Sequence, residues 1–435
     1  MPAPGETAAV SIPAKPNQRF RHWSAAAPHL DWLEPALCGP LRICGSPSLD
    51  TPNTAPLAGV RILDLSRLLP GPLAAQYLAD LGADVVKIED TQAGDYAPLA
   101  LRAACNRNKR GVRLDLKQPD GRKALAALAR GADVLLESFR PGVAARLGAD
   151  YATLAAENPR LVYCSISGYG QDGPRSGEAG HDLNYASCTG VAEQMAGASG
   201  EPALSNLPVA DVLGGSLTAV MGVLAALFDA RRTGIGRHVD IAIADGLLAG
   251  NVVSLATLNA SGGTRPPGTD ALSGGLACYG QYRTRDGRWL AVAALEPKFW
   301  EALCRRLERP DLLAGHRDPA RQPALRAALA AIIGSRPLAH WASLFEGTDC
   351  CVSPVLTLAE SLAQPQVAAR GMLRRTEHPR HGAVLHIACP VKMSGFEFAI
   401  RRQAPEPGEH TEQVLREAGY PPAEIASLAA RGIAL

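Results

Sequence analysis

Residues 60–89 decide the fold class, and they read VRILDLSRLLPGPLAAQYLADLGADVVKIE. The apolar runs Val60–Leu65 and Asp84–Ile88 predict two buried strands, because short runs rich in Val, Ile and Leu suit the interior of a sheet. Between them, Pro72 is typical of the first turn of a helix and Gly82 of its end. The order strand, helix, strand predicts a parallel sheet with helices on both faces.

The same alternation continues toward the middle of the chain, which predicts an α/β domain. The turn after the first strand has no G-x-G-x-x-G motif, so a nicotinamide or flavin dinucleotide is not expected there. We therefore predict a Rossmann-like sheet without that fingerprint. The further predicted elements are a helix at about 122–130, strands at Val134–Glu137 and Leu161–Ile166, a long helix at about 215–229, and strands at His238–Ile243 and Trp289–Leu295.

Two segments rich in proline or glycine mark boundaries along the chain. Residues 1–55 carry frequent prolines and no sustained period, so they are predicted to be an N-terminal extension without chemistry of its own. The break at Ser261–Gly268 is predicted to separate a large domain from a smaller one. At 435 residues, with 47% of them hydrophobic, the chain is long enough for two cores.

Charge and cysteine usage exclude several classes of protein. Lys and Arg number 44 and Asp and Glu 42, and a formal charge of +2 provides no field to gather nucleic acid or an anionic membrane. The 10 cysteines form no C-x-x-C pair and no grouping with histidine at metal-ligand spacing, which favours a reduced compartment and no metal. We see neither a signal peptide nor an apolar stretch of about 18 residues, and we expect a cytoplasmic protein without a membrane span.

Three stretches place a titratable side chain beside glycines or at the end of a predicted strand. They are Gly180–Tyr185 (GHDLNY), Ala210–Ser216 (ADVLGGS) and Leu290–Pro297 (LAVAALEP). With other ordered motifs between Pro56 and Ile433, they resemble the family III CoA-transferases, and within that family most closely the α-methylacyl-CoA racemases. The other motifs are Gly71-Pro72, Leu81–Glu89, Asn106–Arg110, Leu114–Lys117 and Arg140-Pro-Gly142.

The resemblance implies an architecture and an assembly. A large Rossmann-like domain at 56–262 would be completed by the C-terminal segment 376–435, with a smaller α+β domain inserted at 263–375. Two subunits would interlock as a homodimer, each a ring through which the other passes, with the active site between the large domain of one and the small domain of the other. The implied substrate is an acyl-CoA thioester, with CoA as part of the substrate and no metal or redox cofactor.

The resemblance implies three catalytic residues, His181, Asp211 and Glu296. The matching aspartate is the nucleophile of the transferases and an acid–base residue of the racemases, so Asp211 alone does not separate the two activities. Inverting a carbon α to a thioester requires a base on each face, with pKa values near the working pH. His181, oriented by Glu296, would serve one face and Asp211 the other, while the backbone around Asp182 would donate to the enolate oxygen. These roles predict a racemase of 2-methyl-branched acyl-CoA thioesters.

Other roles are open for these residues and for the chain. A histidine beside glycine is often structural, Asp211 could cap the helix that follows it, and Glu296 could open the next helix. The first alternative activity is a CoA-transferase that forms an aspartyl mixed anhydride on Asp211. The short run Ser273–Ala277 disfavours it, because transferases often carry more glycines there. The second alternative is a protein that binds acyl-CoA without turnover.

CoA requires local positive charge for its phosphates and a flat surface for its adenine. Lys109 and Arg110 are candidates for that charge, although either could be an ordinary surface cation. Asp90 is a departure, because family members often carry an arginine there that packs on the nucleotide. The resemblance places along the CoA groove Leu114, Asp115, Leu116, Lys117, Ser138, Phe139, Arg140, Arg146, Gly180, Asp182 and Tyr185.

Overall fold

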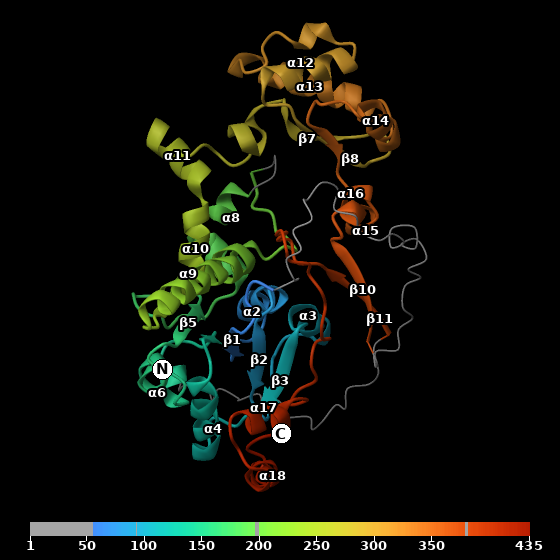
Figure 1. Cartoon of the computed structure of the whole chain (residues 1–435). Helices are drawn as coiled ribbons and strands as arrows, with labels where there is room; N and C mark the ends of the chain where they lie inside the picture. Colours follow the sequence, from blue (N-terminus) through green and yellow to red (C-terminus); the bar gives the residue numbers. More distant parts are fainter. Residues whose placement is uncertain (1–54, 93, 196–199, 379–381) are drawn as a thin grey trace, which may run out of the picture.

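The computed structural model describes residues 55–92, 94–195, 200–378 and 382–435 (Figure 1). The predicted N-terminal extension, apart from Ala55, lies outside the described residues. The described chain forms a sheet of six strands, a second sheet of three strands and a two-stranded hairpin.

The large sheet has the strand order β3-β2-β1-β4-β5-β6, and all its neighbouring strands are parallel. This doubly wound order confirms the predicted Rossmann-like fold. Ligands of such sheets bind at the carboxyl ends of the strands where the order reverses, which here is between β1 and β4. The strands are β1 (Arg61–Asp64), β2 (Asp84–Glu89), β3 (Lys109–Arg113), β4 (Val134–Glu137), β5 (Val162–Ser167) and β6 (His238–Ala242).

Helices cover both faces of this sheet, because successive side chains of a strand point to opposite sides. Ile62 and Val85 belong to one buried core, whereas Leu63 and Val86 belong to another. The first core is closed by α2 (Pro70–Asp80), α9 (Thr218–Thr233) and α10 (Ile243–Gly250), and the second by α4 (Pro119–Arg130), α6 (Tyr151–Glu157), α17 (Thr411–Glu417) and α18 (Pro422–Ala430).

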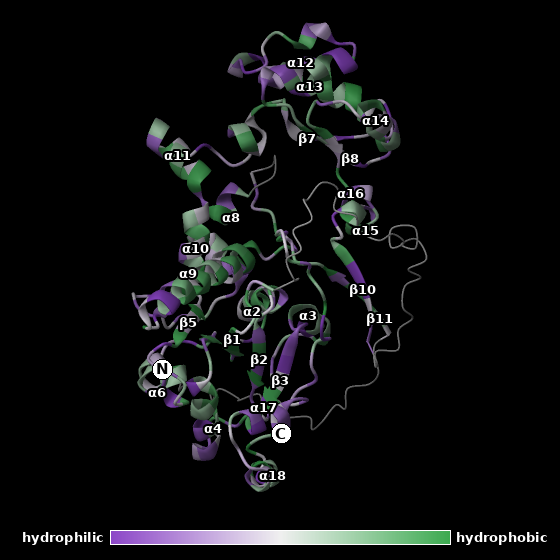
Figure 2. Cartoon of the chain, viewed as in Figure 1, coloured by the Kyte–Doolittle hydropathy of each residue, from purple (hydrophilic) through white to green (hydrophobic). Residues whose placement is uncertain are grey.

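β3 is the strand of the large sheet that the sequence pattern did not predict. It reads KRGVR, and Figure 2 shows it as mainly hydrophilic. Lys109 is buried with its Nζ 2.9 Å from Asp64 Oδ2, and Arg110 is buried with ion pairs to Asp84 and Glu417 at 2.6 and 2.8 Å. Both cations are therefore occupied inside the fold, and neither is available for the CoA phosphates that we considered for them.

The C-terminal segment returns to the edge of the large sheet, next to β3. α17 packs on this strand, and the Arg113 N–H donates to Thr411 Oγ1 at 3.1 Å. The Asp115 N–H donates to Ile433 O at 2.8 Å. The segment thus covers a strand edge that would otherwise present unpaired backbone groups. The segment begins within the antiparallel hairpin of β10 (Leu373–His378) and β11 (Gly382–Ile387).

The small sheet has a core of its own, made of residues between Leu276 and Val352, among them Trp300 and Trp341. Figure 1 shows this sheet and its helices at the opposite end of the molecule from α17 and α18. The limits given above for the inserted domain stay predictions. The elements are β7 (Tyr279–Arg283), β8 (Trp289–Ala293), β9 (Val352–Pro354), α12 (Pro297–Arg306), α13 (Gln322–Gly334) and α14 (Leu338–Phe345), followed by α15 (Leu358–Leu362) and α16 (Pro365–Ala369).

One helical stretch in the described chain, Ala210–Thr233, is long and apolar enough to cross a membrane by composition alone. It begins as the π-helix η2 (Ala210–Leu217) and continues as α9. Val223 and Leu227 are buried in the core on one face of the parallel sheet, which is the usual place of an apolar helix in an α/β domain. The remaining helices are α3 (Leu99–Cys105), α5 (Val143–Arg146), α7 (Asp182–Cys188), α8 (Val191–Gln194), α11 (Val252–Ser261) and three short helices at Ala271–Gly275, Pro310–Leu312 and Pro319–Arg321.

Candidate active site

The predicted residues His181 and Asp211 come together where two helices begin. His181 precedes α7, and Asp211 lies in the first turn of η2. Asp182 joins the two helix starts, because its Oδ1 accepts the backbone N–H of Ala210 at 2.7 Å and that of Asp211 at 3.0 Å. A carboxylate in this position satisfies amides that the start of a helix leaves unpaired. Asp182 therefore fixes Asp211 relative to the start of α7.

The environment of the half-buried Asp211 carboxyl group suits proton transfer near neutral pH. Burial raises its pKa, the Asp182 carboxylate raises the pKa further, and His181 lowers it, so that the pKa lies at about 6. A general acid or base is most effective when its pKa is near the working pH. Asp211 can thus exchange a proton in both directions under ordinary conditions.

His181 is an exposed residue on a fixed backbone. Its N–H donates to Asn184 Oδ1 at 3.0 Å, and its carbonyl oxygen accepts the Asn184 N–H at 2.8 Å. This reciprocal pair holds the start of α7 in place. The first amides of α7, including that of Asp182, lie at the positive end of the helix dipole, where negative charge is stabilised.

Gly180 and Tyr185 form a tightly packed support beside these residues. Tyr185 is buried, its hydroxyl donates to Gly180 O at 2.6 Å, and its ring packs edge-on against Tyr169. A Cβ atom at Gly180 would lie 2.6 Å from the Tyr185 ring, and one at Gly168 would lie 2.5 Å from it. Only glycine fits at both positions. Burial raises the pKa of Tyr185 to about 12, so its hydroxyl stays protonated at neutral pH.

Glu296 lies apart from these residues within one chain. It is exposed at the start of α12, beside the small sheet, where burial and the Glu296 carboxylate together raise the pKa of Cys351. In the part of the chain that the structure describes, the charges that act on Asp211 are those of Asp182 and His181. A single chain therefore brings together two of the three predicted catalytic residues.

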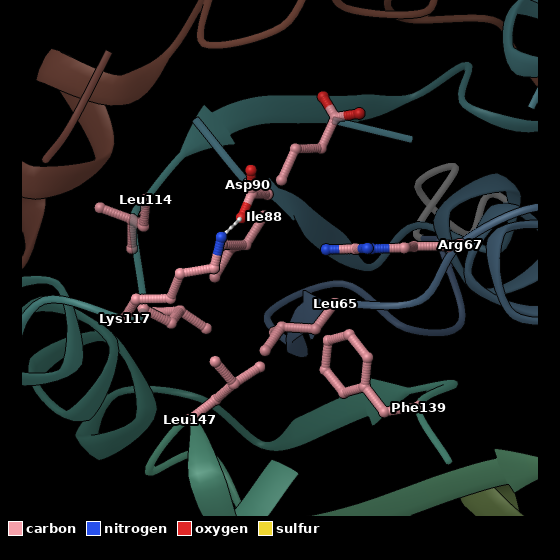
Figure 3. A pocket seen from close by; sticks show the side chains of 10 residues that line it. Leu65, Arg67, Ile88, Asp90, Leu114, Lys117, Phe139 and Leu147 are labelled. Atoms are coloured by element: carbon pink, nitrogen blue, oxygen red, sulfur yellow. Dashed lines mark ion pairs between the residues drawn. The ribbon is translucent and has the colours of Figure 1, made fainter. Parts of the chain in front are cut away.

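A narrow pocket opens at the carboxyl ends of β1, β2 and β4, and Figure 3 shows the side chains that line it. This is the crevice in which doubly wound sheets bind their ligands. Four of the predicted CoA-groove residues line it, namely Leu114, Leu116, Lys117 and Phe139. The exposed Lys117 has its Nζ 3.8 Å from Asp90 Oδ2, so the departure at Asp90 places a carboxylate beside a predicted phosphate-binding lysine.

The predicted groove also includes residues that do not line this pocket, among them Asp115, Arg140 and Arg146. Asp115 is buried, and its Oδ1 accepts the Lys117 N–H at 3.0 Å, so its side chain shapes the turn that carries this lysine. Arg140 is exposed and close enough to Tyr185 for their charges to interact, which places it between the pocket and the start of α7. Arg146 is exposed on α5.

Arg67 also lines the pocket, and the sequence analysis missed it. Its backbone N–H donates to Ser138 Oγ at 2.9 Å, which gives the predicted groove residue Ser138 a supporting contact. Its guanidinium carbon lies 5.3 Å from the ring centre of Tyr96 and 5.5 Å from that of Phe139. A guanidinium group stacked in this way presents a flat, positively charged surface. Its place just after β1, at the carboxyl end of a central strand, is the signal that could have found it.

Comparisons with known proteins place the chain in a family. The model of CoA-transferase family III matches residues 57–411. The chain is 37% identical over 374 residues to alpha-methylacyl-CoA racemase from Homo sapiens, and the aligned region covers 86% of this chain and 96% of that protein. It is 31% identical over 392 residues to succinyl-CoA:glutarate CoA-transferase from Homo sapiens, which covers 86% of this chain and 88% of that protein. A CAIB/BAIF family protein from Brucella suis matches the structure with a TM-score of 0.73 at 30% identity, over 84% of this chain and 99% of that chain.

These matches agree on the family, but they do not decide between its two activities. The family model covers most of the chain, and the relatives match over nearly their whole lengths. One relative is a racemase and the other a transferase at comparable identity, so the matches support an enzyme of this family without separating the two reactions. The chain therefore belongs to CoA-transferase family III.

Proposed function

We propose that this chain racemises 2-methyl-branched acyl-CoA thioesters. The observation that carries the proposal is the meeting of Asp211 and His181 at two helix starts tied by Asp182, with a pKa of about 6 for Asp211. A 1,1-proton transfer requires two neighbouring groups that can each accept and donate a proton, and an imidazole beside a carboxyl group with a raised pKa meets this requirement. The 37% identity to a racemase supports the same choice.

The reaction moves one proton off the α-carbon and another onto it. One base removes the proton and leaves an enolate of the thioester, and the base on the opposite face then protonates the same carbon. His181 serves one face and Asp211 the other. After one inversion the two bases have exchanged protonation states, so the enzyme is ready for the reverse inversion. The Asp182 N–H at the start of α7 donates to the enolate oxygen, where the positive helix end stabilises the developing charge.

The CoA part of the substrate lies, in this proposal, along the pocket at the carboxyl ends of the central strands. Lys117 and Arg67 supply positive charge at the pocket, and Arg140 supplies it on the way to the start of α7. A second copy of the chain supplies Glu296, because this residue is exposed and separate from His181 within one chain. An interlocked homodimer would bring the two residues together.

Epimerisation in heavy water tests the racemase proposal. Given one epimer of a 2-methylacyl-CoA and no free carboxylic acid, the wild type should form the other epimer and place deuterium on the α-carbon. His181→Ala should slow the interconversion by about 100-fold or more, leaving at most exchange with retention through Asp211. His340→Ala changes an exposed histidine on α14 and is the matched control, which should keep the wild-type rate.

A CoA-transferase is the second candidate, and the 31% identity to such an enzyme supports it. In that reaction the Asp211 carboxylate attacks the thioester, and CoA leaves as the thiolate, so that a mixed anhydride forms on Asp211. The thiolate then attacks the aspartyl carbonyl, which releases the donor acid and leaves CoA as a thioester on Asp211. The acceptor carboxylate attacks this thioester and forms a second anhydride, from which the CoA thiolate takes the acceptor acyl group and frees Asp211. Hydroxylamine would trap the acyl group of either anhydride. Transfer to an added acid with a trapped anhydride, and no α-deuteration of any branched acyl-CoA, would replace the racemase proposal with this one.

A further inference from the structure

The last residue of β4, Glu137, carries a buried carboxyl group that the proposed proton transfer does not use. The residue is 3% exposed, and its Oε2 accepts the backbone N–H of Phe139 at 2.7 Å. It also forms a hydrogen bond with the hydroxyl group of Ser165, its neighbour on β5. Burying an acid is costly unless its oxygens are paired, and here both partners come from the end of the sheet that faces the pocket.

The hydrogen bond to Phe139 shapes one wall of the pocket. It folds the turn that follows β4, which carries Ser138 and Phe139. Ser138 Oγ accepts the backbone N–H of Arg67, and the Phe139 ring lies beside the Arg67 guanidinium group. Figure 3 shows Arg67 and Phe139 next to each other in the pocket. The position of Arg67 thus depends on the turn, and the turn depends on Glu137.

A second feature gives Glu137 a partner in either protonation state. Ser165 Oγ lies 2.9 Å from Nε2 of His238, which is an exposed residue on β6. When Glu137 is protonated, it can donate to Ser165, and Ser165 can donate to the neutral imidazole of His238. When Glu137 is ionised, Ser165 donates to the carboxylate and accepts from the Nε2–H of His238. Neither form leaves a buried polar group unpaired.

Glu137 changes its charge near neutral pH. Burial raises its pKa, the bonds from Ser165 and Phe139 lower it, and the Asp240 carboxylate on β6 raises it again, so that the pKa lies at about 7. On β5, burial and Glu137 raise the pKa values of Tyr163 and Cys164, which stay neutral. Burial lowers the pKa of His238, and Asp240 acts against this effect. Glu137 is the group of this cluster that gains a negative charge at ordinary pH.

We propose that Glu137 is a positioning residue for CoA binding, holding the turn of Ser138 and Phe139, and that CoA binds more tightly when Glu137 is protonated. The inference rests on the proposed binding of CoA at this pocket. The phosphates of bound CoA disfavour a buried negative charge nearby, so binding raises the pKa of Glu137. By linkage, the added affinity is present at low pH and is lost as the pH rises through about 7.

Calorimetric titration with free CoA at pH 6, 7 and 8 tests this inference. Glu137→Ala should raise the Kd for CoA by about tenfold at pH 6, because the turn loses its hydrogen bond. The kcat at saturating acyl-CoA should stay within about twofold, because positioning affects ground and transition states alike. Glu137→Gln keeps an oxygen for the Phe139 N–H and should bind CoA at pH 6 as the wild type does. Between pH 6 and 8 the wild type should lose about threefold to tenfold more affinity than Glu137→Gln.

Glu157→Gln is the matched control, because Glu157 is an exposed residue on α6 that pairs with Arg130. Its CoA affinity should follow the wild type at every pH. If the wild type binds CoA and both Glu137 variants bind it equally well with the same pH dependence, the inference is wrong. If the wild type binds no CoA, the proposed function fails, and this inference fails with it.

Discussion

Asp182 acts on Asp211 in two ways that a substitution can separate, through its hydrogen bonds and through its charge. Asp182→Asn keeps an oxygen that can accept the two backbone N–H groups but removes the negative charge. The pKa of Asp211 should therefore fall, and the acid limb of kcat/KM against pH should move to lower pH by about one unit.

Asp229→Asn is the control for this pH profile. Asp229 lies on α9 and pairs with Arg232 and Arg237 at the surface, so its loss should leave the limb unchanged. If the acid limb of Asp182→Asn lies at the same pH as that of the wild type, the charge of Asp182 does not set the pKa of Asp211.

The strands of the large sheet differ in how far a sequence pattern can predict them. β1 and β2 follow from their apolar runs, because strands of a parallel sheet are buried on both faces. β3 does not, because its burial depends on Asp64 of β1 and Asp84 of β2. The site shows the same limit. Motifs in the sequence identify His181, Asp211 and Glu296 as candidates. No local pattern shows that Glu296 lies apart from the other two in space.

The buried ion pair between Lys109 on β3 and Asp64 on β1 makes a stability prediction. Burial raises the pKa of Asp64, but Lys109 and Lys87 lower it by more, so the pKa lies below its usual value. The fold therefore favours the ionised Asp64 at neutral pH, and this contribution is lost as the pH falls through the lowered pKa. Burial also lowers the pKa of Lys109, which offsets part of the stabilisation, so the larger effect is expected when one partner is removed and the other stays buried. Lys109→Met should lower the free energy of unfolding by about 3 kcal/mol at pH 7, because it leaves the buried carboxylate with Lys87 alone.

Urea unfolding followed by far-UV circular dichroism measures this effect. The difference between Lys109→Met and the wild type should shrink on acidification, because a protonated Asp64 needs no cationic partner. Lys123→Met removes an exposed lysine that pairs with Asp120, and its unfolding midpoint should match the wild type. Equal midpoints for both variants would show that the Lys109 pair is not a structural requirement of the edge strand.

Among the residues that the structure describes, large apolar side chains are exposed on α9 and α11. Met221 and Phe228 on α9 are 67 and 76% exposed, and Val252 and Leu255 on α11 are 62 and 55% exposed. Large apolar side chains that are exposed repeatedly along two helices point to an interface. Together with the remote position of Glu296, it supports the proposed homodimer, in which each active site would take residues from both copies.

Co-expression of two inactive variants tests this shared site. In a mixed dimer of His181→Ala and Glu296→Ala chains, one site has both defects and the other has neither. Random pairing should then restore about a quarter of the wild-type epimerisation rate, because half of the dimers are mixed and each has one intact site. The two variants expressed separately and mixed after folding should stay inactive if the chains interlock. No recovery on co-expression would place His181 and Glu296 in one chain's site or outside catalysis.

The closing of the β3 edge by the C-terminal segment has a consequence for synthesis on the ribosome. Arg113 and Thr411 are 298 residues apart in the chain, and the whole small sheet is translated between them. Until α17 has left the ribosome, β3 lacks the helix that covers its edge, and Arg110 lacks its partner Glu417. The other strands of the large sheet have been synthesised by then. Such long-range pairing slows folding and exposes an open strand to other chains. Nascent chains that stall within the small sheet are therefore the form of this protein that most needs a chaperone.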